Sequence, residues 1–418
     1  MAITSLFSSS VMVETPYINI TIGDYIFGVY DKSKGVIIPR GAKGKYALPN
    51  YVNSMNVTKV NGQINTYTIS LTYAIQQGGD PNLIEKVLSS VSGTREIIIS
   101  YGDYALPTYS FKNEKAMITK VTSQIDVTQS LITYTIICVS TALKLNGEKF
   151  YFEKRTNTRP STIIIDELLS NEKYGLLDIF YGMRNKELLS TLIPTTDRPV
   201  TIEEKRDITA FDYLKYLVNC MSDVNDTNDS VKKVYKYTLV INDDTTDTYQ
   251  GTYFKINRIA QNTNKFNAAE IYEVDVGYPS NSKVMGFSIS DDQTYSILYN
   301  YANDTANTDY KFLIDDKGEV VPQFAPSISN SRELMKTTEA DKTWWSQLTQ
   351  FPIKATLTIR GLLKPIVLMS IIKINTLFYG KRHISSGYYT VTKEVDSISA
   401  QGYSTTLSLV RIGGDDEL

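Results

Sequence analysis

Apolar and polar residues alternate along three separate stretches of the chain, and these stretches share one pattern. They are Val57–Tyr73, Ile118–Val139 and Val391–Val410; each begins with Val or Ile followed by Thr-Lys, passes through polar residues and returns as a Thr-rich run. Alternation with a period of two is typical of a strand with one buried face, so each stretch predicts a β-hairpin. Related hairpins near both ends of the chain indicate two related β-units.

The third stretch also predicts which side chains share a face. Tyr403, Thr405, Leu407 and Leu409 fall on one face, and Thr406, Ser408 and Val410 fall on the other. If such a hairpin lines a channel, we expect the Thr/Ser face to point into it. In the first stretch, the Asn61-Gly62 pair is a strong signal for a tight turn.

Helical periodicity appears in two places. Over residues 80–91, Asp80 is positioned as the N-cap, Pro81 fits the first turn, and an apolar stripe follows. Between residues 160 and 223, the segments PSTIIIDELLSNEKYGLLDIFYGM and DITAFDYLKYLVNCMSD read as helices, with Thr209 as the cap of the second.

The order of these elements predicts an α+β protein that is mainly β, with a β-barrel unit at each end and an α/β unit between them. The expected divisions are an N-terminal arm over residues 1–12, a first β-barrel domain over 13–142, a central α/β domain over 143–285 and a second β-barrel domain over 286–418. An irregular Asp-, Asn-, Thr- and Ser-rich section at 303–343 interrupts the last domain.

Composition and charge narrow the classes of function. The chain of 418 residues contains 30 Tyr, which supports a β-rich fold and also suits protein interfaces. Lys and Arg number 43 against 45 Asp and Glu, a net charge of −2. This balance gives no electrostatic basis for wrapping nucleic acid, although it is compatible with a channel through which nucleic acid passes without binding.

The cysteines and the apolar runs indicate synthesis in the cytoplasm. Cys138 and Cys220 are too few for a disulfide framework, and Cys138 lies in the apolar run TIICV, where we expect it to be a buried small hydrophobe. The first residues resemble no secretion signal, and the longest apolar run is interrupted by Lys364, Pro365 and Lys373. We therefore expect no membrane anchor.

Candidate chemistry is sparse. His383 is the single histidine, and its position in YGKRHISSG favours a solvated loop over catalysis. The acidic clusters at residues 222–229 and 242–247 lack the spacing of a calcium loop and are predicted to be surface loops. No phosphate-binding loop or nucleophile motif is present in the sequence. We expect no enzyme, cofactor or metal, although a carboxylate pair that acts on glycosides is set in space and stays open.

Several stretches resemble one family, the baseplate hub proteins of contractile-tailed bacteriophages, which are similar to late control D proteins. The resemblance is carried by NVTKVNGQINTYTISLTYAIQQGGDPNLIEKVL, SYGD, ITYTIICVS, ITAFDYLKYL, VDVGYPSNSKVMGFSIS and GYYTVTKEVDSISAQGYSTTLSLVRIGG. These stretches follow the family's order and cover most of the chain, but none is a catalytic fingerprint. The section at 303–343 departs from the family pattern, which leaves the spike-facing surface open.

The resemblance implies two tail-tube-like domains in each chain and a homotrimeric ring in which six such domains imitate sixfold symmetry. A hub of this kind adapts the hexameric tail tube to the trimeric central spike. Its implied partners are further copies of itself, the tail tube protein, the central spike protein and other baseplate proteins, with DNA only as a passenger through the channel. The implied location is the virion, after assembly in the cytoplasm of the bacterial host.

Turn signals and aromatic content suggest which residues contact partners. The partner-binding candidates are Asn61, Gly62, Tyr104, Trp344, Trp345, Arg382, Tyr388 and Tyr403. Three other functions stay open: a different tail-tube or distal tail protein, a β-rich adhesin, and a hydrolase within the central unit. A tube protein needs only one β-domain, and a secreted adhesin needs a secretion signal.

Overall fold

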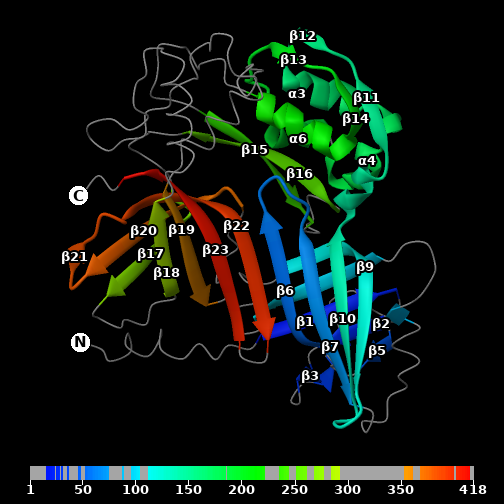
Figure 1. Cartoon of the computed structure of the whole chain (residues 1–418), viewed down its shortest axis with the longest axis vertical. Helices are drawn as coiled ribbons and strands as arrows, with labels where there is room; N and C mark the ends of the chain where they lie inside the picture. Colours follow the sequence, from blue (N-terminus) through cyan, green and yellow to red (C-terminus); the bar gives the residue numbers. More distant parts are fainter. Residues whose placement is uncertain are drawn as a thin grey trace, which may run out of the picture.

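The computed structural model describes residues 16–23, 25–28, 30–31, 35–36, 46–48, 52–74, 87–88, 96–103, 112–184, 186–221, 235–243, 251–260, 268–276, 284–291, 353–360, 368–399 and 402–414. Strands dominate these residues, as Figure 1 shows, so the expected mainly β class is confirmed. Predicted features outside these ranges include most of the helix expected over 80–91. Of that helix, Val87 and Leu88 are described, and both are helical and buried.

The three repeated stretches form three antiparallel hairpins that lie side by side in one sheet. They are β6 (Val52–Val60) with β7 (Thr66–Ala74), β9 (Lys112–Asp126) with β10 (Leu131–Ser140), and β22 (Gly387–Ser399) with β23 (Gly402–Gly413). Their order across the sheet is β23-β22-β6-β7-β10-β9 (Figure 1). The hairpins predicted from the repeat are therefore confirmed.

An N-terminal β-unit is built around the first two hairpins. Beyond β9, the sheet continues through β8 (Glu96–Asp103), β1 (Pro16–Ile22), β2 (Tyr25–Gly28) and β5 (Tyr46–Leu48). The short strands β3 (Tyr30–Asp31) and β4 (Gly35–Val36) pair separately. Strand β1 also lies next to β22, so the sheet curves around its apolar face.

A C-terminal β-unit is built around the third hairpin. On one side of it lie β19 (Ile353–Arg360) and β18 (Val284–Asp291); on the other lie β20 (Ile371–Phe378), β21 (Lys381–Arg382) and β17 (Glu270–Val276), which is parallel to β20. Strand β17 falls within the span expected for the central domain, yet its Tyr272 packs into the C-terminal apolar core.

Strand β22 joins the two β-units because it is longer than either of its partners on that edge. Residues Gly387–Thr390 pair with β20, whereas Lys393–Ser399 pair with β6 of the N-terminal β-unit. Among the described strands, the sheet of 15 strands is thus one open path from β18 to β5 with a branch at β22. The structure thus joins the two expected β-units in a continuous sheet, and no closed barrel is found among the described strands.

The central unit packs beside this sheet (Figure 1). Its helical turns are η3 (Thr141–Asn146), α3 (Pro160–Thr162), η4 (Ile163–Leu168), η5 (Glu172–Tyr174), α4 (Leu176–Ile179), η6 (Tyr181–Met183), α5 (Lys186–Leu192) and α6 (Ala210–Cys220). Its strands form the pairs β11 (Lys149–Phe152) with β14 (Lys205–Thr209), β12 (Arg155–Thr158) with β13 (Val200–Ile202), and β15 (Tyr235–Asn242) with β16 (Tyr253–Ala260).

Local sequence explains the two helical regions. Thr209 caps α6, because its Oγ1 accepts a hydrogen bond of 3.1 Å from the backbone N–H of Asp212, and the apolar stripe of α6 is buried. The region 160–183 forms several short helical turns instead of long helices. One of them, η5, ends at Gly175, which adopts a left-handed φ of 64°. Within the described part of the chain, no helix has the length and apolar character needed to cross a bilayer.

Three apolar clusters correspond to the three units, but they share elements at their borders. Ile398 and Tyr403 of the third hairpin belong to the N-terminal cluster, and Val240 of β15 belongs to the C-terminal cluster. The third hairpin shows the predicted alternation: Tyr403, Thr405, Leu407 and Leu409 are buried, whereas Thr406, Ser408 and Val410 are only partly buried. Cys138 is also buried as expected.

Candidate functional site: a buried polar junction

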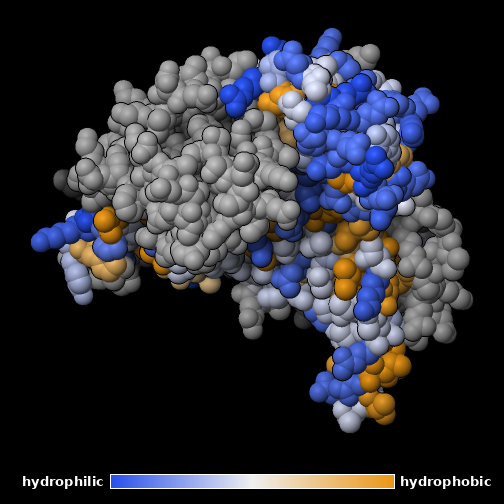
Figure 2. Space-filling model, turned by 45° about the horizontal axis from the view of Figure 1, so that its top comes forward, coloured by the Kyte–Doolittle hydropathy of each residue, from blue (hydrophilic) through white to orange (hydrophobic). Residues whose placement is uncertain are grey.

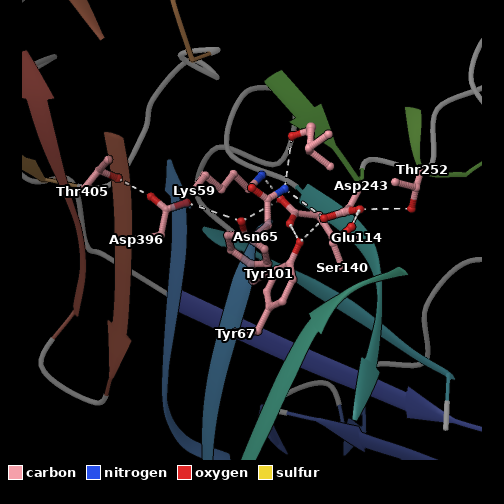
Figure 3. A network of polar contacts seen from close by, with 11 residues as sticks. Lys59, Asn65, Tyr67, Tyr101, Glu114, Ser140, Asp243, Thr252, Asp396 and Thr405 are labelled. Carbon is pink, nitrogen blue, oxygen red and sulfur yellow. Dashed lines mark hydrogen bonds and ion pairs between the residues drawn. The ribbon is translucent and has the colours of Figure 1, made fainter. Parts of the chain in front are cut away.

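A network of buried polar side chains lies where the three units meet (Figure 3). Each unit contributes to it. The members are Lys59 of β6, Asn65 directly before β7, Tyr67 of β7, Tyr101 of β8, Glu114 of β9, Ser140 of β10, Asp243 after β15, Thr252 before β16, Asp396 of β22 and Thr405 of β23. We call this set the polar junction.

Glu114 is the centre of the junction. Its carboxylate forms a buried ion pair with the ammonium of Lys59. It also accepts hydrogen bonds from the hydroxyl of Tyr67 at 2.6 Å and from that of Tyr101 at 2.9 Å. A buried charge is costly unless it is paired and hydrogen-bonded, and Glu114 satisfies both conditions.

Asp243 brings the central unit into the junction. One carboxylate oxygen, Oδ2, accepts from the amide of Asn65 at 2.9 Å and lies 3.0 Å from the hydroxyl oxygen of Tyr67. The other, Oδ1, accepts from the hydroxyls of Ser140 at 2.6 Å and Thr252 at 3.0 Å. Side chains from the N-terminal β-unit (Asn65, Tyr67 and Ser140) and from the central unit (Thr252) therefore surround this one carboxyl group.

Burial sets the protonation of Asp243. Desolvation raises its pKa from 3.8 to about 6, against the hydrogen bonds from Ser140 and Asn65, which lower it. Tyr67 has one hydroxyl proton and two carboxylates within reach, so it donates fully to only one of them. The shorter contact is the one to Glu114. Below about pH 6, where Asp243 is protonated, its carboxyl group can donate to the Tyr67 oxygen.

The C-terminal β-unit joins the junction through Tyr101 and Asp396. The hydroxyl of Tyr101 lies 3.4 Å from Asp396 Oδ2, and Asp396 Oδ1 accepts from the hydroxyl of Thr405 at 2.6 Å. Burial, then the nearby carboxylates, raise the pKa of both Tyr67 and Tyr101 well above 10. Both phenols therefore remain neutral donors at physiological pH.

Backbone hydrogen bonds reinforce the same junction. The Asn61-Gly62 turn donates from Asn61 N to Thr392 O at 3.0 Å and from Gly62 N to Leu239 O at 2.8 Å. Lys115 N donates to Asp243 O at 3.1 Å. One turn thus contacts the C-terminal β-unit and the central unit at once, so the arrangement fixes the three units relative to one another.

The chemistry of the junction is structural. All its carboxylates are buried and accept hydrogen bonds from fixed donors. Within the described ranges, no group of three or more His, Cys, Asp or Glu side chains is arranged to hold a metal ion.

A second feature is the polar face of the sheet opposite the apolar cores. Cross-strand register places Thr58 of β6, Val395 of β22, Thr406 of β23 and Thr358 of β19 in one row. The same face carries mostly hydroxyl and amide side chains from both β-units, together with the charged side chains of Lys354, Arg360 and Lys393. The hydroxyl and amide side chains are Ser54, Asn56, Thr58, Thr66, Thr68, Ser70, Thr72, Thr133, Thr135, Thr356, Thr358, Ser397, Ser399, Ser404, Thr406 and Ser408. We call this the hydroxyl face.

The predicted partner-binding residues lie in different parts of the chain. Asn61 and Gly62 are in the turn at the polar junction, Arg382 is in β21, and Tyr388 of β22 lies under the ammonium of Lys373 at 5.4 Å from its ring centroid. Tyr403 is 2% exposed and packs edge-on against Tyr101, so it presents no surface in this conformation. Tyr104, Trp344 and Trp345 lie outside the described residues.

The acidic clusters differ from expectation at one residue. Residues 222–229 and 244–247 lie outside the described residues, but Asp243 is fully buried in the polar junction, so the prediction of a surface loop is wrong there. The sequence signal for the junction was available in part. Lys59 continues the inward-facing series of Met55 and Val57, and Glu114 begins the inward-facing series of its own strand. Charges on a buried face predict a buried pair.

Comparisons with protein-family models and with curated protein sequences found no match. Solved structures similar to this chain are phage tail and type VI secretion proteins. A 43 kDa tail protein of prophage MuSo2 from Shewanella oneidensis is 11% identical, with a TM-score of 0.48 and 95% and 97% of the two chains covered. A tail protein from Neisseria meningitidis is 8% identical, with a TM-score of 0.48 and coverage of 95% and 96%.

A third similar structure is an E. coli component of the type VI secretion system. It is 9% identical, with a TM-score of 0.41 and coverage of 86% of this chain and 73% of the other. All three TM-scores lie below 0.5, so these similarities assign no function to the chain by themselves.

Proposed function

We propose that this chain is a structural baseplate hub of a contractile phage tail. Three copies would form a ring that adapts the hexameric tail tube to the trimeric central spike and surrounds the DNA channel. The hydroxyl face is the observation that carries the proposal. It runs without a break across both β-units, because β22 pairs directly with β6.

A channel wall has to pass DNA without holding it. Clustered Lys and Arg would bind the phosphates through counterion release, and clustered Asp and Glu would repel them. The hydroxyl face is made mostly of Thr, Ser and Asn side chains, and its cations are spaced instead of clustered: Thr356 and Thr358 separate Lys354 from Arg360 along β19. This spacing weakens phosphate binding, in keeping with a net charge of −2 for the whole chain. Pairs such as Thr358 and Thr406, whose hydroxyls lie 3.3 Å apart, also hold the face together locally.

The internal repetition supports the proposed ring. Each chain carries related hairpins in two β-units, so a trimer presents six β-units around one axis. The division into a 13–142 domain, a 143–285 domain and a 286–418 domain is part of this proposal. Within the chain, strand pairing between β22 and β6 already joins the two β-units. The ring needs a further contact between copies.

The proposed partners are the tail tube protein, the central spike protein and other baseplate proteins, and the proposed location is the virion. The mechanism is assembly, so the proposal excludes catalysis by this chain. A tail-tube or distal tail protein is the alternative. It would assemble as a hexamer and not as a trimer.

The test is the native mass of the purified chain, alone and mixed with candidate tube and spike proteins. The hub predicts a species of three times 47.1 kDa, formed alone or on addition of the spike protein. A stable hexamer would favour the tube protein. A chain that stays monomeric with every tail protein, or that turns over a glycan substrate, would refute the hub.

A further inference from the structure

Two turns project from opposite ends of the sheet, and both carry exposed apolar side chains (Figures 1 and 2). The first joins β9 to β10, where Ile125 is 63% and Val127 is 85% exposed. The second joins β20 to β21 and continues to Ile384; Tyr379 and Ile384 are each 72% exposed. Apolar side chains that gather on a projecting turn are typical of interaction sites, in contrast to single ones scattered over a surface.

The β9–β10 turn is rigid and carries a negative charge. Asp126 Oδ1 accepts hydrogen bonds from the backbone N–H groups of Thr128 at 2.9 Å and Gln129 at 3.1 Å, and from the Thr128 hydroxyl at 2.6 Å. These hydrogen bonds lower the pKa of Asp126, led by the one from the Thr128 side chain. The turn thus presents an ionised carboxylate between two apolar side chains at neutral pH.

The β20–β21 turn is strained and carries positive charge. Tyr379 and Gly380 have φ angles of 49° and 78°, the left-handed pair of a type I′ turn. Gly adopts this conformation freely, whereas a bulky side chain such as Tyr costs about 1–2 kcal/mol there. Lys381 and Arg382 follow directly. A tyrosine kept at a strained and exposed position indicates a role outside the fold of the single chain.

The base of this second turn is fixed. His383 N donates to Thr376 O at 2.9 Å, the Ser386 hydroxyl donates to Thr376 O at 3.1 Å, and the His383 ring packs against Phe378 with centroids 4.9 Å apart. A turn held in one conformation loses little entropy when it binds. Both turns are therefore preorganised.

We propose that the β20–β21 turn of one copy docks against the β9–β10 turn of a second copy of this chain. The charges are complementary, since Lys381 and Arg382 would face Asp126, and the apolar side chains of the two turns would cover one another. Two different patches at opposite ends of a subunit make a heterologous, head-to-tail contact, which generates a ring when the rotation that relates neighbouring copies closes. The inference rests on the proposed function and names the contact that closes its ring.

Disulfide trapping tests the contact directly. Val127→Cys and Tyr379→Cys place one thiol on each turn, and the native Cys138 and Cys220 are both buried. A mixture of the two variants under mild oxidation should give a covalent dimer, whereas each variant alone should not. Tyr151→Cys, at an exposed position of the central unit, replaces either partner as the matched control. A cross-link yield no higher than with Tyr151→Cys overturns the proposal.

A second measurement separates association from folding. Tyr379→Asn relieves the strain at the left-handed position, so thermal stability of the monomer should stay equal or rise, while the Kd of self-association should rise at least about tenfold. Unchanged self-association in this variant contradicts the docking. If the native mass shows a trimer but the two cysteine variants do not cross-link, only this contact is refuted. If no trimer forms with any tail partner, the proposed function itself is refuted.

Discussion

The Asp243→Asn variant should become more stable, relative to the unsubstituted protein, as the pH rises from 4 to 7.5. Asp243 is fully buried at the polar junction, with Asn65 and Tyr67 on one carboxylate oxygen and Ser140 and Thr252 on the other. An Asn side chain keeps an acceptor for the amide of Asn65. Its amide N–H group can donate to the hydroxyl oxygens of Ser140 and Thr252, because each hydroxyl can rotate to accept.

The magnitude follows from the shift in protonation. The pKa of Asp243 is 3.8 in an ordinary setting and about 6 in the folded chain, mainly because of burial. At pH values between these two pKa values, the Asp243 carboxyl is protonated in the folded chain and ionised in the unfolded chain. The free energy of unfolding therefore falls as the pH rises. A shift of about two units corresponds to about 3 kcal/mol, lost between about pH 4 and about pH 6. Asn cannot ionise and escapes this loss.

The assay is urea unfolding of both proteins between pH 4 and pH 7.5. The difference in unfolding free energy, variant minus parent, should grow by about 3 kcal/mol over this interval; the other carboxylates contribute equally to both and cancel. Asp197→Asn removes a buried carboxylate that bonds Ser161 outside the junction and controls for loss of a buried acid. A difference that stays constant with pH would refute the argument that Asp243 is protonated within the junction.

Three further predictions concern the fold. Lys59→Met should cost about 3–5 kcal/mol, because it leaves Glu114 charged and buried, and adding Glu114→Gln should recover much of the loss in chemical denaturation. Leu407→Ala should cost about 2–5 kcal/mol, whereas Thr406→Ala on the hydroxyl face should cost about 0.5 kcal/mol or less; equal losses would contradict the assigned faces. Thr209→Ala should lower stability by about 1 kcal/mol through loss of the α6 cap, and a change under about 0.2 kcal/mol would argue against it.

Local pattern was sufficient to predict the hairpins and their faces. Period-two alternation at Tyr403, Thr405, Leu407 and Leu409 depends only on the pleat of a strand, and the Asn61-Gly62 turn depends only on local φ preferences. The cap at Thr209 is equally local, since its hydroxyl bonds a backbone group three residues away. The helical region after Pro160 was harder, because it divides into several short helical turns, of which η5 ends at the left-handed Gly175.

The pairing between distant strands could not be predicted from local sequence patterns. Nothing in the repeat says that Lys393–Ser399 pair with Ser54–Val60, which lie more than 300 residues away in the sequence. The repeat predicted one β-barrel unit at each end of the chain and did not show how the two units would join. Strand β22 extends past β20, and its free edge is satisfied by β6.

The amino-acid sequence by itself determined the strands, the turns and the side chains that each strand turns inward, because these depend on contacts within a few residues. Only the tertiary structure decided that Lys59, Glu114, Asp243 and Asp396 meet in one buried junction. Lys59 and Glu114 lie in inward-facing series of their own strands, but nothing in those segments identifies their partners. Their burial is possible only because partners from three units arrive together, and the free energy of a buried charge depends on that arrangement in space.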